Sequence, residues 1–243
     1  CMNKAKEPQR IKFDGFIQGG GLSEYISVPA WQLIRMDEKA DLDHAALTEP
    51  LACCVHSISK ARIKFGDTVV IIGMGIMGYF HLKLALMQGA RVIVSEMDET
   101  RKQKALESGA HVVIDPGKQD LAEEVRKLTD GLGADVVVNT IPSLSVWNSA
   151  IDTLAPYGRL IAYSSQDSKE PVGVDFGKVH SREIEFIGTL NPTIEDNERA
   201  VRLITYGMID MEEVIDARFP FEQGKEAFEA ALKPGAYRVI INY

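Results

Sequence analysis

Short apolar runs alternate with helix-length amphipathic segments from residue 67 onward, and this alternation narrows the possible folds to a few. The runs are rich in Val and Ile and nearly continuous, as in strands that are buried on both faces of a parallel sheet. They cover residues 68–72, 91–95, 112–114, 135–139, 159–163 and 184–188. The segments between them with apolar residues at helical spacing cover residues 77–88, 99–108, 121–128 and 144–154. The pattern predicts an open, doubly wound α/β sheet of six parallel strands with helices on both faces.

The flanking segments follow a different pattern. Residues 22–28 alternate between apolar and polar, which predicts an antiparallel strand of another domain. Residues 50–62 are predicted to be helical, with Pro50 at the first helical position. The tail predicts helices near residues 195–206 and 222–232 and a final strand over 237–241.

A glycine motif connects the first predicted strand to the first predicted helix. Gly73, Gly75 and Gly78 form the pattern G-x-G-x-x-G directly after residues 68–72. The first glycine permits a tight turn, the second lets a pyrophosphate approach the backbone, and the third allows helix and strand to pack closely. Ile76 and Met77 lie at the helix N-terminus, where free N–H groups favour phosphate. The motif in this context predicts a dinucleotide-binding Rossmann sheet with strand order 3-2-1-4-5-6.

An acidic residue ends the second predicted strand. Glu96 follows residues 91–95 and lies 18 residues after Gly78, close to the spacing of about 20 typical of the dinucleotide fingerprint. A carboxylate there accepts hydrogen bonds from the adenosine ribose and repels a 2′-phosphate, so the sequence favours NAD over NADP. Met97 follows it, and Arg101 could flank the adenine or its ribose. The alternative is a solvated acid at a strand end that binds no ligand.

Several further segments carry a resemblance to a known family. They are Gly20-Gly21-Leu22-Ser23-Glu24-Tyr25 with Val28-Pro29, Thr48-Glu49-Pro50-Leu51-Ala52 with His56, Gly66-Asp67-Thr68-Val69-Val70, Gly109-Ala110, and Gly133-Ala134-Asp135-Val136-Val137. With the glycine loop, they make the chain similar to the medium-chain dehydrogenase/reductases, in particular the zinc-dependent polyol (sorbitol) and threonine dehydrogenase branch. The resemblance implies a Rossmann domain over residues 51–191. It assigns residues 1–50 and 192–243 to portions of a GroES-like, mostly β catalytic domain.

The resemblance also implies an activity, which is hydride transfer between a secondary alcohol (a polyol or sugar alcohol) and NAD with a catalytic zinc. It gives Glu49 the role of catalytic residue and zinc ligand, and aligns Cys1 with one structural-zinc cysteine. The family's other zinc ligands precede the region that this sequence covers, and a catalytic zinc normally takes three protein ligands. The expectation is therefore that an N-terminal part is missing, or that the chain is a zinc-free remnant.

Glu49, Cys53 and His56 offer a second metal hypothesis, because positions i, i+4 and i+7 share one helix face. Pro50 argues against it, since a residue before proline is disfavoured in helical geometry and Glu49 would then point off the helix end.

The loops after the last three predicted strands complete the expected cofactor site. Ligands of open α/β sheets bind at the carboxyl ends of the strands. By resemblance, these loops contact the adenine, the nicotinamide ribose and the carboxamide. The candidate residues are Thr140, Ile141, Pro142, Ser164, Leu190 and Asn191.

Three other functions remain open at this point. The chain could be a catalytically silent NAD-binding remnant, a zinc-free quinone-type reductase of the same family, or a Rossmann-like methyltransferase. Tyr79 and Lys83 match the spacing of the short-chain dehydrogenase pair. They fall in the helix after the glycine loop, the wrong element for that chemistry, so they are interpreted as packing and surface residues.

Charge and cysteine content bound the partners. The chain has 27 Lys and Arg against 35 Asp and Glu, a net charge of −8, which argues against sequence-independent nucleic-acid binding. No apolar run reaches the roughly 20 residues of a membrane helix, and no signal peptide is evident. Three cysteines, two of them adjacent, make no disulfide framework, so a reducing cytoplasmic location is expected.

A small-molecule alcohol is the expected partner. A homodimer or homotetramer formed through the sixth strand is expected by resemblance.

Overall fold

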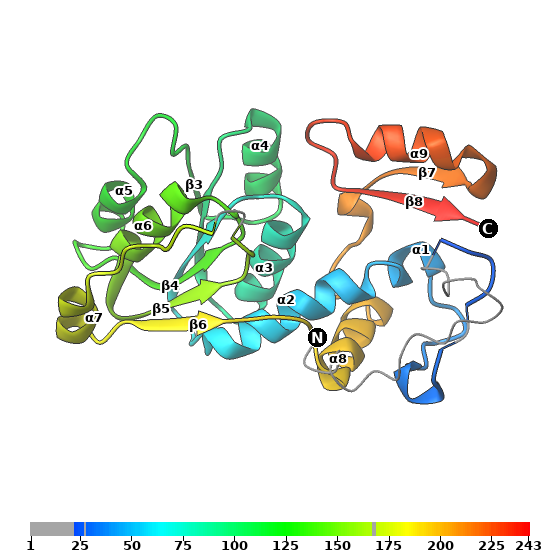
Figure 1. The fold of residues 1–243 in the computed structure, drawn as a ribbon, viewed down its shortest axis with the longest axis horizontal. Helices are drawn as coiled ribbons and strands as arrows, with labels where there is room; N and C mark the ends of the chain where they lie inside the picture. The colour runs from blue at the N-terminus through cyan, green and yellow to red at the C-terminus, as the bar shows by residue number, and fades with distance from the viewer. Residues whose placement is uncertain (1–21, 27, 167–168) are drawn as a thin grey trace.

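A six-stranded parallel sheet forms the centre of the molecule. The computed structural model describes residues 22–26, 28–166 and 169–243 (Figure 1). The strand order is β3-β2-β1-β4-β5-β6, as the sequence predicts for a Rossmann sheet. The strands are β1 (Thr68–Ile72), β2 (Arg91–Ser95), β3 (Val112–Ile114), β4 (Ala134–Asn139), β5 (Leu154–Ala162) and β6 (Glu185–Gly188).

Helices cover both faces of this sheet (Figure 1). One face packs against α2 (Thr48–Ala61), α3 (Ile76–Met87) and α4 (Glu99–Glu107). The other packs against α5 (Leu121–Lys127), α6 (Leu144–Thr153) and α7 (Phe176–Arg182). The doubly wound arrangement predicted from the sequence is thereby confirmed.

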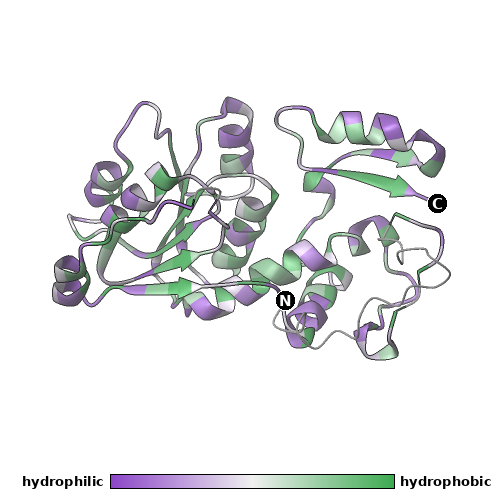
Figure 2. Ribbon diagram, in the orientation of Figure 1, coloured by the Kyte–Doolittle hydropathy of each residue, from purple (hydrophilic) through white to green (hydrophobic). Residues whose placement is uncertain are grey.

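Burial explains why the strand sequences are continuous apolar runs. All five residues of β1 are buried, and alternate side chains enter different cores. Val69 and Ile71 belong to the core under α2 and α3, whereas Val70 and Ile72 belong to the core under α5 and α6. Figure 2 shows the corresponding hydrophobic strands between helices with hydrophilic outer faces.

The parallel register aligns the carboxyl ends of neighbouring strands at one edge of the sheet. Ile72, the last residue of β1, is paired with Ser95 at the end of β2 and with Asn139 at the end of β4. The glycine loop and the loop after β4 therefore leave the sheet side by side. This is the edge at which open α/β sheets bind ligands.

The tail forms a second, smaller unit. Helix α8 (Ile194–Thr205) packs along α2, and the chain then passes through η3 (Glu212–Val214). Two parallel strands, β7 (Ile215–Pro220) and β8 (Arg238–Asn242), form a separate sheet joined by η4 (Phe221–Gln223) and α9 (Gly224–Ala231). Two short elements precede α2, namely η2 (Ala30–Gln32) and α1 (Leu42–Ala45).

Some predicted elements differ from the structure. The strand expected over residues 22–28 is not found, and the described residues 22–26 and 28 lie in bends and coil. Strand β7 and helix α7 were not predicted, and the latter has only seven residues with none buried. The division into domains at residues 50 and 192 stays a prediction.

No helix in the described part of the chain is long and apolar enough to cross a membrane.

Candidate functional site

The glycine loop has the geometry that its sequence predicts. Gly73 has φ of +93°, and a Cβ atom there would lie 2.6 Å from Cδ1 of Ile141. At Gly78 a Cβ atom would lie 2.0 Å from the carbonyl oxygen of Gly73, which is too close for any side chain. A Cβ atom at Gly75 would meet no described atom within 4 Å. The first and third glycines thus fold the loop, and the second leaves space for a ligand at the N-terminus of α3.

Glu96 lies against this loop and is half-buried. Its Oε2 accepts a hydrogen bond from the Met74 N–H at 2.8 Å. Its Oε1 accepts from the N–H groups of Met97 at 2.8 Å and Asp98 at 3.0 Å. A carboxylate has about four lone-pair sites, and these three N–H groups leave about one of them to accept from a ribose hydroxyl. The acid expected to contact ribose therefore also ties the end of β2 to the loop.

Arg101 projects from the first turn of α4 toward the tail unit. Its guanidinium carbon lies 5.9 Å from the ring centroid of Tyr237, and its Nε is buried without a partner in the described structure. The Tyr237 hydroxyl donates to the Met74 carbonyl at 3.0 Å. Burial raises the pKa of Tyr237 to about 12, so this hydroxyl is protonated at neutral pH. The sequence did not single out Tyr237, since a lone tyrosine at the start of a predicted strand has no diagnostic spacing.

The loops after β4 and β5 are bonded to each other. Thr140 Oγ1 donates to the Ile72 carbonyl at 2.7 Å, and the Ser164 hydroxyl donates to the Ile141 carbonyl at 3.0 Å. Pro142 follows in the same loop. After β6, Leu190 is 75% exposed and Asn191 has φ of +54°. The predicted residues of these loops thus lie after the carboxyl ends of their strands.

Two buried polar atoms at the same edge have no hydrogen-bond partner among the described residues. They are the hydroxyl of Ser95 and the Nδ2 of Asn139, both in residues almost fully buried. Oδ1 of Asn139 accepts from the Ile141 N–H at 2.9 Å, which orients the amide. The open space at Gly75, the first turn of α3 and the Glu96 carboxylate together fit a dinucleotide.

The metal hypotheses have a different outcome. Glu49 lies inside the first turn of α2, which begins at Thr48, so the expectation that Pro50 would displace it from the helix is wrong. Position 50 is the third helical residue, and proline is tolerated in a first turn because its missing N–H would be unpaired there. The Cys53 thiol donates to Oε1 of Glu49 at 3.3 Å.

His56 is not part of that contact. Its Nδ1 bonds Asp196 of α8 at 2.7 Å, so His56 joins two helices. Within the described ranges, no three His, Cys, Asp or Glu side chains gather as a metal site. Cys1 lies outside the described residues. The described residues therefore do not supply a zinc site, and Glu49 keeps its metal role only as a prediction.

The remaining candidates have packing roles. Cys54 is fully buried beside Met77 and Tyr163. Tyr79 is fully buried with its hydroxyl on the Asp210 carbonyl at 3.0 Å, and Lys83 pairs with Glu213 at 3.1 Å. The Tyr79–Lys83 spacing thus reflects packing, as interpreted from the sequence.

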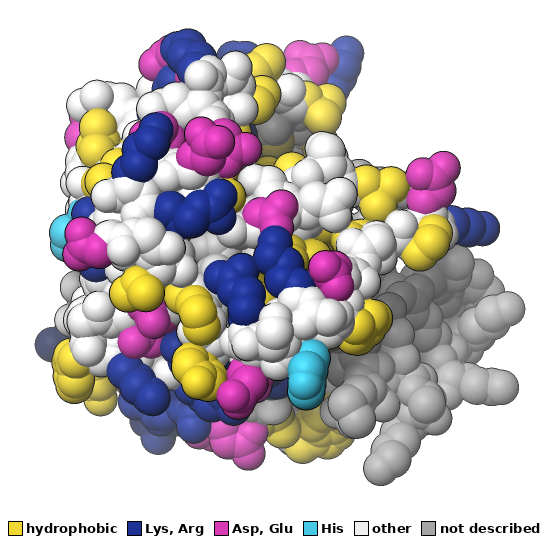
Figure 3. Space-filling model, turned by 90° about the vertical axis from the view of Figure 1, so that its left-hand side faces the viewer, with side chains coloured by type: hydrophobic (Ala, Val, Ile, Leu, Met, Phe, Trp, Pro, Cys, Tyr) yellow, Lys and Arg dark blue, Asp and Glu magenta, His cyan; other side chains and the backbone are white. Residues whose placement is uncertain are grey.

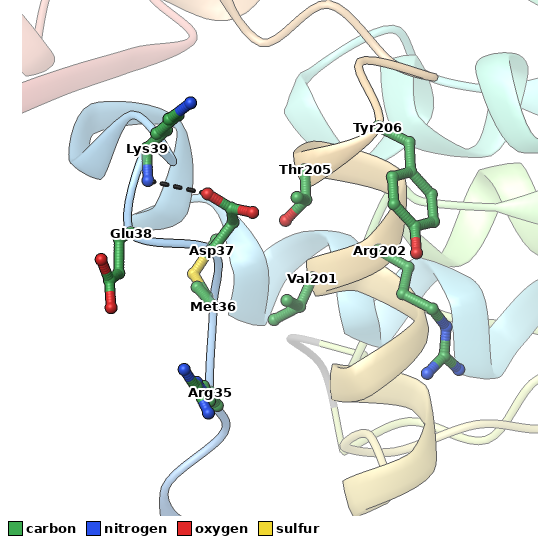
Figure 4. Close-up of a pocket in the computed structure, with 9 residues that line it drawn as sticks. All are labelled: Arg35, Met36, Asp37, Glu38, Lys39, Val201, Arg202, Thr205 and Tyr206. Carbon is green, nitrogen blue, oxygen red and sulfur yellow. Dashed lines mark hydrogen bonds between the residues drawn. The ribbon is translucent and has the colours of Figure 1, made fainter.

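A pocket of about 520 Å³ lies elsewhere, between residues 35–39 and helix α8. Figure 4 shows its lining, in which the Lys39 N–H donates to Asp37 Oδ1 at 2.9 Å and Val201 and Thr205 of α8 point toward residues 35–39. The lining contains none of the predicted site residues. The molecular face in Figure 3 shows basic and acidic side chains interspersed, without one dominant sign. The pocket does not contain the glycine loop, so the sheet edge is the candidate dinucleotide site.

Comparison with known proteins identifies the family. The family model described as "Zinc-binding dehydrogenase" matches residues 73–206, more than half of the chain. This match begins at the first glycine of the loop and ends just after α8. The chain belongs to the zinc-binding dehydrogenases.

Curated relatives support the same family. D-arabitol-phosphate dehydrogenase of Enterococcus avium is 30% identical over 230 residues, covering 93% of this chain and 65% of that protein. (R,R)-butanediol dehydrogenase of Neisseria gonorrhoeae is 32% identical over 228 residues, covering 92% and 64%. This chain thus spans slightly less than two thirds of the length of each of these two relatives.

Solved structures match the fold. A zinc-binding dehydrogenase of Sinorhizobium meliloti 1021, bound to NADP, superposes with a TM-score of 0.87 at 26% identity, covering 99% of this chain and 71% of that one. The 2R,3R-butanediol dehydrogenase of Bacillus subtilis has a TM-score of 0.84 at 23% identity, covering 93% and 65%. The second likeness concerns the fold alone.

Proposed function

We propose that this zinc-binding dehydrogenase binds NAD and transfers a hydride between it and a secondary alcohol of a polyol or a related small alcohol. One observation carries the proposal. The glycine loop leaves open space at Gly75, where no side chain caps the N-terminus of α3 in the described structure, and the Glu96 carboxylate stands beside it. The open helix end suits a pyrophosphate, and the carboxylate suits a ribose with free hydroxyls.

The residues of this chain would bind and orient the cofactor. Gly73 and Gly78 set the loop, while the N–H groups of Gly75, Ile76 and Met77 face the phosphates. Glu96 accepts from the adenosine ribose, Met97 and Arg101 flank it, and the loops after β4, β5 and β6 line the rest. Those loop residues are Thr140, Ile141, Pro142, Ser164, Leu190 and Asn191. When bound, the nicotinamide ring supplies the hydride acceptor.

The choice of NAD depends on charge. A 2′-phosphate next to the Glu96 carboxylate would be repelled, whereas the 2′-hydroxyl can donate to it. The Sinorhizobium meliloti relative was solved with NADP, so the preference requires a direct measurement. Titration of the purified protein with NADH and NADPH, followed by calorimetry, should give tighter binding of NADH. Equal binding, or tighter binding of NADPH, would contradict the proposal.

The substrate class comes from the relatives. Their names specify D-arabitol phosphate, butanediol and sorbitol, all of which have vicinal hydroxyls on a short carbon chain. A panel of these alcohols with NAD, monitored through NADH absorbance, tests the class. Oxidation of simple primary alcohols in preference to every polyol would contradict it.

We also propose that residues 51–191 form the cofactor domain, and that residues 1–50 and 192–243 belong to the substrate-binding domain. Glu49 is the residue of this chain that we propose as a ligand to a catalytic zinc. The ligands that complete such a site would come from outside the described residues. Zinc content of the full-length protein, compared between the wild type and Glu49→Gln, tests this role. Undiminished zinc in the variant would contradict it.

A subunit contact through β6 stays a proposal from the resemblance. This strand is at the edge of the sheet, with Phe186 42% exposed. Sedimentation of the wild type and of Phe186→Lys would show whether the edge holds a dimer or tetramer together. An unchanged mass in the variant would argue against that contact.

A further inference from the structure

One residue of the tail unit contacts the phosphate loop directly. Tyr237 lies just before β8, about 160 residues after the loop in the chain. Its hydroxyl donates to the Met74 carbonyl at 3.0 Å. Its ring stands edge-on to Tyr79 with centroids 6.5 Å apart, and the Arg101 guanidinium lies over it. The ring is thus held from two sides while the hydroxyl points at the loop.

Met74, the residue between the first two glycines, is held from both sides of its backbone. Its N–H donates to Glu96 at the end of β2 at 2.8 Å. Its carbonyl accepts from Tyr237, which belongs to the other part of the molecule. Its side chain is fully buried. Two consecutive peptide groups of the loop are therefore fixed by two side chains from separate elements.

The orientation of the second peptide group determines where Gly75 can donate. In a planar trans peptide the C=O and the N–H point in opposite directions. The bond from Tyr237 to the Met74 carbonyl therefore directs the Gly75 N–H away from Tyr237. No described residue accepts a hydrogen bond from this N–H, and a methyl group on Gly75 would meet nothing within 4 Å. An unpaired donor beside open space at a helix N-terminus is suited to an anion.

We propose that Tyr237 is a positioning residue for the pyrophosphate of the dinucleotide. It acts through the Met74 carbonyl, which sets the direction of the Gly75 N–H, and it does not itself touch the ligand. The proposal rests on the proposed function, since it presupposes that the loop binds a dinucleotide. It also gives the tail unit a direct part in forming the cofactor site.

The test compares two ligands that differ in the pyrophosphate. Tyr237→Phe keeps the ring against Tyr79 and Arg101 and removes the hydroxyl. Calorimetry with ADP-ribose should show a Kd raised about three- to ten-fold, the effect of losing one ordinary hydrogen bond. A titration with adenosine, followed by nuclear magnetic resonance, should show an unchanged Kd, because adenosine has no phosphate to contact Gly75.

Tyr79→Phe is the matched control. It loses a hydroxyl whose hydrogen bond goes to the Asp210 carbonyl at the same 3.0 Å length, in the same part of the molecule, but does not reach the loop. Both ligands should bind this variant as they bind the wild type. Equal weakening of ADP-ribose and adenosine by Tyr237→Phe would assign Tyr237 a packing role and overturn the proposal. Unchanged ADP-ribose binding would overturn it too. Failure of the wild type to bind ADP-ribose would instead reject the proposed function itself.

Discussion

The Glu96 carboxylate accepts a hydrogen bond from the Met74 N–H at 2.8 Å, so the acid that we propose as the ribose ligand also holds the glycine loop. The same carboxylate accepts two N–H groups that lead into α4, from Met97 and Asp98. One side chain thus links β2, the loop after β1 and the start of α4. A change at Glu96 is expected to affect loop order and cofactor choice together.

Glu96→Gln should weaken NADH binding about ten- to one-hundred-fold. The substitution keeps the shape of the side chain but removes its charge, and hydrogen bonds to a charged acceptor contribute about 1.5–3 kcal/mol. NADPH binding should weaken less, because the repulsion of the 2′-phosphate is lost. Calorimetric titration with both cofactors measures the ratio. Glu99→Gln, three residues away on α4 and paired with Lys102, should leave the ratio unchanged. An unchanged ratio in Glu96→Gln would place the ribose elsewhere.

Two glycine variants should separate folding from binding. Gly78→Ala places a methyl group 2.0 Å from the Gly73 carbonyl, so it should destabilise the fold by about 1–3 kcal/mol, as overpacking does. Gly75→Ala has open space and an ordinary φ of −72°, so the protein should unfold as the wild type does. Its NADH affinity should fall because the methyl group occupies the phosphate position. Urea unfolding and NADH titration of both variants measure the two effects. Full NADH affinity in Gly75→Ala would contradict this placement of the phosphates.

The central strands of the sheet could be predicted because their residues are buried on both faces. Residues 68–72 and 92–95 are buried, so the two strands are apolar apart from Thr68, Arg91 and Ser95 at their ends, and their bounds match the structure. Strand β7 has the opposite character. It is a parallel partner of β8 in a sheet of two strands, and alternate residues of it are exposed, so its sequence has no continuous apolar run. The alternation over residues 22–28 was wrongly assigned to a strand because alternation alone provides no partner strand.

The residues of the candidate site also fall into two groups, those that a local sequence pattern identifies and those that only the folded structure identifies. Glycine spacing and the acid after β2 depend on local geometry, so the sequence is sufficient to identify them. The partners of Met74 and His56 are Tyr237 and Asp196, which are more than 130 residues away in the chain. Such pairs depend on how the tail returns to the sheet, which no local pattern specifies. The position of Glu49 was missed for another reason, since the rule for a residue before proline is weak in a first helical turn.

The stability of the protein should fall on acidification between about pH 6.5 and pH 4. His81 is fully buried, with Nε2 on the Ser57 hydroxyl at 2.8 Å and Nδ1 on the Met77 carbonyl at 2.7 Å. Burial lowers its pKa from 6.5 to about 4, so the unfolded state binds a proton in this range that the folded state does not. Stability is therefore present above the unfolded pKa and lost as the pH falls toward the folded one, by an amount on the order of 3 kcal/mol.

His81→Gln, which cannot titrate, should flatten this part of the pH profile of the unfolding free energy, whatever its stability at neutral pH. His180→Gln removes an exposed histidine from the short helix α7 and should leave the slope as it is in the wild type. Urea unfolding at closely spaced pH values measures both slopes. The same slope in His81→Gln and in the wild type would show that other groups control acid unfolding.

Arg159 should contribute far more to stability than its neighbour Arg62. Arg159 is buried in β5, where its guanidinium donates to the Ala61 and Arg62 carbonyls at 2.7 and 2.6 Å and to Asp67 at 2.9 Å. Arg159→Met would leave the Ala61 and Arg62 carbonyls at the end of α2 without their side-chain donor, and Asp67 with only the Lys64 N–H, at a cost of about 3 kcal/mol or more. Arg62→Met removes an ion pair with Glu185 in which both side chains are at least half exposed, and should cost less than about 1 kcal/mol. Equal losses in urea unfolding would contradict the role of Arg159 as the connection between α2 and the sheet.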